Sequence, residues 1–173
     1  MREPEPQPAG EGQAPITVES LYNRWGPDLY RYALMILADP GGAEDAMHQV
    51  FAKLVRMKQL PAAGSWEKYL RTAVRNECFR LLPTRPAAGL DAVQPFLETR
   101  DAAPMDDDER AMVEKALRRL TPDQREVVHL KIYEGRTFQD IADFLDIPLN
   151  TAASRYRYAL DRLRKELASL KDR

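Results

Sequence analysis

The chain has 173 residues, of which 44% are hydrophobic and 31% are charged, enough apolar material for one mid-sized domain or two small ones. Lys and Arg together number 26 against 27 for Asp and Glu, so a polyanion-binding surface requires local clustering of cations. One cysteine and two histidines exclude a disulfide framework and a Cys/His zinc site, and we expect neither metal nor cofactor.

Residues 1–15 carry four of the thirteen prolines and no aromatic side chain, so we expect a disordered tail. This segment also lacks the apolar core of a signal peptide, and no apolar run in the chain approaches the ~20 residues needed to cross a bilayer. The expectation is a cytoplasmic protein without membrane insertion.

Residues 16–82 show apolar positions at helical spacing, which predicts a lobe of three or four packed helices. Leu21, Trp25 and Leu29 mark the first helix, which we expect Gly26-Pro27 to interrupt, because the proline ring opposes continuation from the preceding turn.

Residues 83–108 form the next segment, with four prolines and six acidic residues against two basic ones, so we predict a flexible acidic linker. Residues 109–173 then hold fourteen basic and eleven acidic residues in a second helical pattern. Within it Thr121, Pro122 and Gln124 form a capping box. No segment sustains a period of two, so the predicted fold is all-α, with two small helical lobes.

The pattern of residues 137–170 is typical of a helix-turn-helix: a short helix with apolar positions at helical spacing, a break, and a longer helix. Thr137 can cap the first helix, Ala142 is small where the two helices must approach, and Asp146 tolerates a left-handed turn. The second helix should begin at Asn150 or just before it.

A helical wheel at ~100° per residue divides this second helix into two faces. The apolar stripe consists of Ala152, Tyr156, Ala159, Leu160, Leu163, Leu167 and Leu170. The candidate DNA-contacting residues are Asn150, Thr151, Ser154, Arg155, Arg157 and Tyr158. Asn, Ser and Arg can read base edges in a major groove, and a flanking arginine can hold phosphate. The alternative is that the arginines only solvate an exposed helix; the joint presence of the short helix, the turn and the capped helix favours DNA.

Several stretches resemble the bacterial sigma factors of the extracytoplasmic-function (ECF) type. Leu120 to Leu167 resembles their region 4, and GPDLYRYALMIL from Gly26 and AEDAMHQVFAKLVR from Ala43 resemble their region 2. The resemblance implies a two-lobed factor that directs RNA polymerase to promoters. Region 2 would bind core polymerase and the −10 element, and region 4 the −35 element.

The resemblance assigns polymerase docking to the helix over residues 43–58, with Asp45, His48, Gln49 and Phe51 as candidates. His48 stands where the family usually has glutamine, and Gln49 where it usually has an acid. Phe51 has the alternative of packing in the core of the lobe. In the recognition helix, Ala153 and Tyr158 replace common basic residues, so the promoter sequence should differ from the family's commonest one.

The helix over residues 65–82 resembles the element that captures the opened −10 strand, which requires aromatic platforms and cations beside unstacked bases. The candidates are Trp66, Tyr69, Arg71, Thr72, Arg75 and Asn76. A tryptophan at helical spacing is more often a core residue, so the alternative for Trp66 is packing in the core of the lobe instead of stacking on a base. Leu81 to Arg85 stands where the family often has several basic residues, which predicts weaker binding to the DNA backbone there.

Two other functions are alternatives to the sigma-factor hypothesis. A free-standing helix-turn-helix regulator with a sensor or dimerisation lobe would bind duplex DNA without polymerase. An enzyme has little support, because Glu44, Asp45 and His48 share a helix without a nucleophile or a phosphate-cradling loop. We therefore expect no catalysis and no small-molecule substrate. The sequence leaves open the promoter, the inducing signal and whether an anti-sigma factor is a partner.

Overall fold

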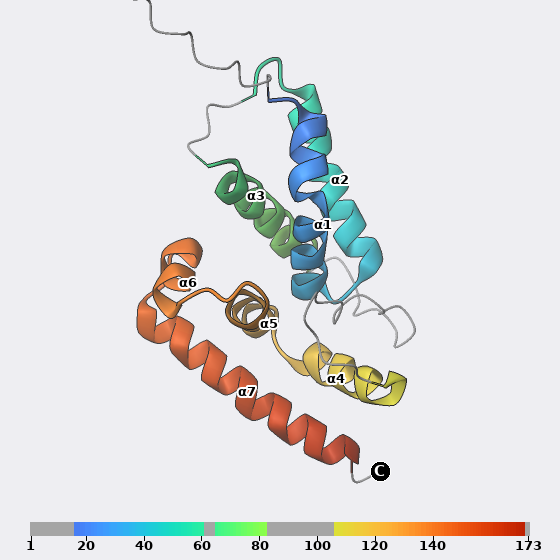
Figure 1. Cartoon of the computed structure of the whole chain (residues 1–173), viewed down its shortest axis with the longest axis vertical. Coiled ribbons are helices and arrows are strands. Elements are labelled where there is room, and N and C mark those ends of the chain that lie inside the picture. Colours follow the sequence, from blue (N-terminus) through green and yellow to red (C-terminus); the bar gives the residue numbers. More distant parts are fainter. Residues whose placement is uncertain (1–15, 61–64, 83–105, 172–173) are drawn as a thin grey trace, which may run out of the picture.

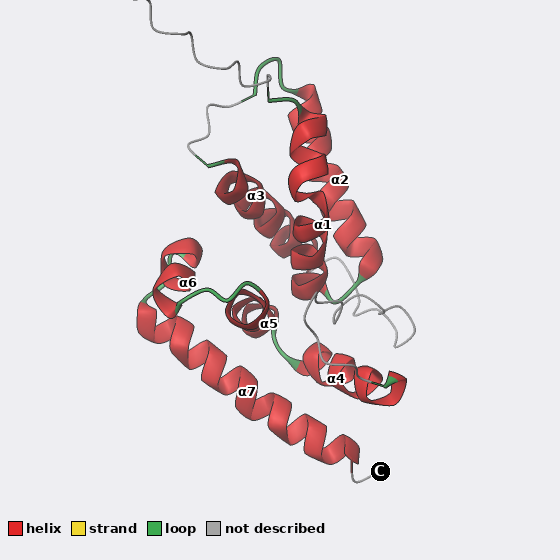
Figure 2. Ribbon diagram, in the orientation of Figure 1, coloured by secondary structure: helices red, strands yellow, loops and turns green. Residues whose placement is uncertain are grey.

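The computed structural model describes residues 16–60, 65–82 and 106–171. These residues form seven α-helices and one π-helical turn, and they contain no strand (Figure 2). The all-α prediction is confirmed. None of the helices in these ranges is long and apolar enough to span a membrane.

The first lobe consists of α1 (Val18–Leu37), α2 (Pro40–Arg56) and α3 (Trp66–Leu81), all packed on one another (Figure 1). Thr17, Asp39 and Ser65 cap the three helices with side-chain oxygens that accept backbone N–H bonds. The core lies along α1, where every residue from Tyr32 to Leu37 is buried. Helix α1 is therefore enclosed on several sides.

Pro27 lies inside α1 without ending it, so the predicted interruption at Gly26-Pro27 is wrong. A proline in a helix interior costs ~3 kcal/mol through its missing N–H and its ring. Buried Leu21 and Leu29 flank it, and their packing holds both halves of the helix on the same core. Tertiary packing therefore outweighs the local preference for a break.

The second lobe contains α4 (Asp107–Arg119), α5 (Pro122–Val128), η2 (His129–Tyr133), α6 (Phe138–Leu145) and α7 (Leu149–Lys171). Helices α4, α5 and α6 all contact α7, which runs along the whole lobe (Figure 1). The predicted capping box at Thr121 is confirmed, with the Gln124 N–H donating to its hydroxyl at 3.3 Å. A π-helical turn continuing α5 was not predicted.

The predicted linker over 83–108 ends earlier than expected. Asp106 caps α4, and Asp107 and Asp108 form its first turn, where negative charge is favoured by the positive end of the helix dipole. Residues 83–105, like the predicted tail over 1–15, lie outside the described ranges.

The two lobes pack against each other, chiefly where α5 contacts α1. Tyr32 in α1 donates its hydroxyl to Glu126 in α5 at 2.5 Å, and both side chains are completely buried. The described residues thus form one body with an interior polar junction between the lobes.

Candidate nucleic-acid and polymerase interfaces

The helix-turn-helix is formed by α6 and α7. Thr137 caps α6 in a reciprocal box with Asp140, and Asp146 ends that helix with a φ of 54°, in the left-handed region. Ala142, buried at 3% exposure, lies on the side of α6 that packs on α7. Helix α7 begins at Leu149, as the sequence predicted. This fixes the orientation of α7 relative to the rest of the lobe.

The face of α7 predicted to contact DNA is largely accessible. Asn150, Arg157 and Tyr158 are exposed, and the Arg157 guanidinium lies 5.2 Å from the centre of the Tyr158 ring. Thr151 and Ser154 are half-buried, and the Ser154 hydroxyl donates to the Thr151 carbonyl at 3.0 Å. On the other side, Ala152 and Ala159 are fully buried, which agrees with the predicted stripe.

Arg155 has a partner inside the lobe. Its guanidinium lies 3.4 Å from the Asp123 carboxylate at the start of α5, and its side chain is 28% exposed. A phosphate contact by Arg155 would therefore compete with this ion pair. Arg157 has the more accessible guanidinium of the two.

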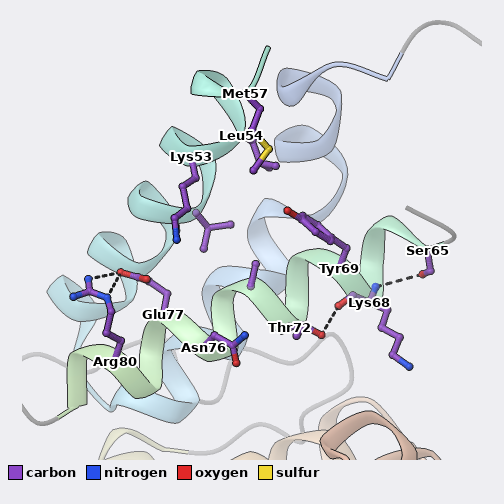
Figure 3. A pocket seen from close by; sticks show the side chains of 12 residues that line it. Lys53, Leu54, Met57, Ser65, Lys68, Tyr69, Thr72, Asn76, Glu77 and Arg80 are labelled. Carbon is purple, nitrogen blue, oxygen red and sulfur yellow. Dashed lines mark hydrogen bonds and ion pairs between the residues drawn. The ribbon is translucent and has the colours of Figure 1, made fainter. Parts of the chain in front are cut away.

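A groove of about 780 Å³ lies between α2 and α3 (Figure 3). Val50, Leu54 and Met57 provide apolar wall on the α2 side, and Tyr69 does so from α3. Two predicted −10 residues, Thr72 and Asn76, are exposed along the same groove. Apolar walls beside amide, hydroxyl and aromatic groups form a suitable environment for an unstacked base.

Cations that sequence reasoning missed also line this groove. They are Lys53 from α2 and Lys68 and Arg80 from α3. Lys68, Thr72, Asn76 and Arg80 repeat at intervals of four, so they share one face of α3. That spacing was available in the sequence and would have added both cations. The Arg80 guanidinium donates to Glu77 at 2.5 Å and is 60% exposed.

Trp66 and Tyr69 pack against each other edge-on, with ring centres 5.5 Å apart. Both are half-buried and contact the hydrophobic core of the lobe. Their rings thus have a structural role, and only Tyr69 also lines the groove.

Arg71 and Arg75, two further −10 candidates, point to the second lobe. Arg71 is 7% exposed and donates to Glu67 and Glu134. Arg75 donates to Glu126 through Nε at 2.7 Å and Nη2 at 3.3 Å. Burial lowers the pKa of Arg75, but the hydrogen bond to Glu126 outweighs that effect and raises it. Neither guanidinium faces the groove with Thr72 and Asn76.

The predicted polymerase-docking residues lie on α2. Asp45, His48 and Gln49 are exposed, whereas Phe51 is 8% exposed and meets the Tyr22 ring edge-on at 5.0 Å. Tyr22, Phe51 and His48 line a second groove, of about 590 Å³, between α1 and α2. Phe51 is thus mainly a core residue beside an accessible polar face.

Comparison with known protein families finds two matching models. Residues 21–85 match sigma-70 region 2, which covers the first lobe, and residues 116–165 match sigma-70 region 4, which covers most of the second.

Curated relatives match over most of the chain. The ECF RNA polymerase sigma factor SigK of Mycolicibacterium vanbaalenii is 29% identical over 84% of this chain and 79% of its own length. SigE of Mycolicibacterium smegmatis, also an ECF RNA polymerase sigma factor, is 26% identical over 92% of this chain and 65% of its own.

Among solved structures, the fold matches the sigma factor RpoE of Bartonella quintana, crystallised with the anti-sigma factor NepR. The TM-score is 0.66 at 21% identity, over 87% of this chain and 96% of that one. This match shows a shared fold.

Proposed function

We infer, from the premise that this chain is an RNA polymerase sigma factor of the ECF type, that it binds core RNA polymerase and directs transcription initiation at specific promoters. The observation that carries this is the presence of regions 2 and 4, in that order, in one chain. The free-standing regulator is disfavoured, because its first lobe would not match region 2. The family consists of initiation factors without catalytic activity, so we propose no reaction for this chain.

We propose that α7 reads the −35 element in the major groove. The support is the exposure of Asn150, Arg157 and Tyr158 on a helix held by a capped helix-turn-helix. Arg157 can contact guanine with two donors, and its guanidinium lies within cation–π distance of the Tyr158 ring. Thr151 and Ser154 add hydroxyl groups on the same face.

The α2–α3 groove is the proposed site for an unstacked base of the −10 element. Tyr69 offers an aromatic wall, Thr72 and Asn76 offer hydrogen bonds, and Lys53 and Lys68 offer charge for the neighbouring phosphates. Arg71 and Arg75 join this surface only once they leave their carboxylate partners.

The exposed face of α2, with Asp45, His48 and Gln49, is the proposed docking surface for core polymerase. A factor that works with polymerase on the chromosome acts in the cytoplasm. The Bartonella neighbour was solved with an anti-sigma factor, and a protein of that kind is a further proposed partner of this chain.

The test is to incubate the full chain, core polymerase and sheared genomic DNA, then sequence the fragments that the complex retains. We expect retained fragments to share two short motifs at fixed spacing, and none to be retained without polymerase. Arg157→Ala should relax the upstream motif at one position and leave the downstream motif unchanged. Sequence-specific retention by the chain alone would contradict the proposal.

A further inference from the structure

The α2–α3 groove contains a carboxylate that the proposed −10 function does not use. Among the described residues that line this groove, Glu77 alone is acidic. A carboxylate repels the phosphates of a DNA strand, so its presence beside Lys53 and Arg80 needs a physical reason. Glu77 is 8% exposed, and keeping an acid that far from solvent costs free energy unless its oxygens have partners.

The Glu77 carboxylate has one oxygen occupied and one available. Arg80, one turn further along α3, donates to Oε1 through both Nε, at 3.1 Å, and Nη2, at 2.5 Å. No described residue donates to Oε2, although Glu77 lines the groove. Arg80 therefore holds the carboxylate and offsets its charge, while Oε2 keeps its capacity to accept a hydrogen bond from a molecule in the groove.

Glu77 lies too far along α3 to contact a base that stacks on Tyr69. Eight positions of helix separate the two residues, a rise of ~12 Å. Figure 3 shows Tyr69 toward one end of the groove and the Glu77–Arg80 pair toward the other. The groove, of about 780 Å³, therefore has room for a second base at the Glu77 end.

We propose that the Glu77 end of the groove is a second base subsite, where Oε2 accepts a hydrogen bond from the exocyclic amino group of adenine, cytosine or guanine. Thymine has no such group, and it places its N3–H between two carbonyl oxygens that the carboxylate repels. Glu77 therefore selects against thymine at one position of the single strand. This inference rests on the proposed −10 function of the groove.

An ion pair with Arg80 alone would give Glu77 a purely structural role. An i, i+3 pair on a helix, with one partner 60% exposed, contributes little to stability. Such a pair would leave every base equally acceptable, whereas a carboxylate oxygen that faces a base discriminates among bases. The base preference of the complex therefore separates the two roles.

The test uses the full chain with core polymerase and a promoter fragment that the complex retains. The downstream motif is made single-stranded, and each of its positions carries adenine, cytosine, guanine or thymine in turn. We expect one position at which thymine weakens binding of the wild type about tenfold, the size of a hydrogen bond to a charged group. In Glu77→Gln this penalty should largely disappear, because the amide can rotate to donate to a thymine carbonyl.

The matched control is Asp161→Asn, which removes the acid of another i, i+3 pair with an arginine, Arg164 on α7. This variant should keep the full thymine penalty. A second measurement replaces the preferred base by its analogue without the amino group, which is purine for adenine, hypoxanthine for guanine and 2-pyrimidinone for cytosine. The analogue should cost the wild type more binding than it costs Glu77→Gln.

Three results would count against the proposal. Equal penalties in the wild type and Glu77→Gln would overturn the second subsite and leave −10 recognition by the groove intact. The absence of an analogue penalty at every position of the wild type would overturn the subsite even if Glu77→Gln failed to fold, which circular dichroism shows. If no base of the single strand affected binding of the wild type, the −10 function of the groove and the subsite within it would both be wrong.

Discussion

Ala38 and Asp146 are the described non-glycine residues with positive φ, at 53° and 54°, and each ends a helix. An aspartate accepts this conformation more readily than an alanine, because its side chain bonds locally to the backbone. The position of Asp146 in the helix-turn-helix was predictable for that reason. Nothing in an alanine indicates a left-handed cap, so the end of α1 at Ala38 could not be predicted.

Ala38→Gly should stabilise the protein by about 0.5–1 kcal/mol, because glycine adopts the left-handed cap without a Cβ penalty. Urea unfolding of the full chain measures this change. As a control, Ala33→Gly within α1, fully buried and helical, should destabilise it. A loss of stability in Ala38→Gly would show that this cap is not left-handed.

Arg157→Ala should cost ~1–3 kcal/mol of binding to the preferred −35 sequence and relax one base position. Arg155→Ala should cost less, because Arg155 must first leave Asp123. Both costs are measured by competition between promoter DNA fragments for the complex of each variant with core polymerase. Leu163→Ala, on the inner side of α7, is the contrasting variant: it should lower the melting temperature while sparing sequence preference. If Arg157→Ala lowered the melting temperature and left the DNA sequence preference unchanged, the assignment of Arg157 to the DNA-contacting face of α7 would be wrong.

At the scale of elements, α2 separates a buried face from an exposed one, which is consistent with the helical spacing of apolar positions over residues 16–82. Ala46, Val50 and Leu54 are buried, whereas His48 and Gln49 are exposed. The exception is Pro27 in α1, where local sequence predicted a break that burial overrides. Periodicity reports which face is buried, but it does not report how strongly neighbouring helices hold an element together.

Asp45→Lys with Gln49→Lys should weaken binding to core polymerase by more than tenfold, because both substitutions reverse or add charge on the proposed docking face. Surface charges singly are often worth less than ~1 kcal/mol, so the double variant is needed. Affinity for immobilised core enzyme is the measurement. Helicity should stay unchanged, since both positions are exposed. If the double variant kept full affinity for core polymerase, the docking surface would not lie on α2.

At the scale of the whole molecule, sequence predicted the two lobes but not their junction. Tyr32 and Glu126 are 94 positions apart, and neither carries a local signal for the other. Arg71 and Arg75 were predicted as DNA contacts because the helix over residues 65–82 resembles the element that captures the opened −10 strand, which requires cations beside aromatic platforms. The structure pairs them with carboxylates of the other lobe, which only the tertiary arrangement determines.

The contribution of Glu134 to stability should disappear in acid. Burial raises its pKa, but the hydrogen bond from His129 and the charges of Arg71 and Arg136 outweigh burial and lower it to about 2. A depressed pKa means that the stabilisation is complete above the unfolded value near 4.5 and is lost as pH falls toward 2. Urea unfolding of the wild type and Glu134→Gln should therefore differ most at neutral pH and converge toward pH 2. A difference independent of pH would show that the Glu134 charge is not what stabilises the junction.

Promoter-directed initiation is tested most directly by run-off transcription with core polymerase on a DNA fragment retained by the complex. With the chain present, we predict transcripts that begin at one position, a fixed distance downstream of the two shared motifs. Scrambling either motif should abolish them, and core polymerase alone should give none. Equal transcription from the fragment with and without the chain would contradict the account.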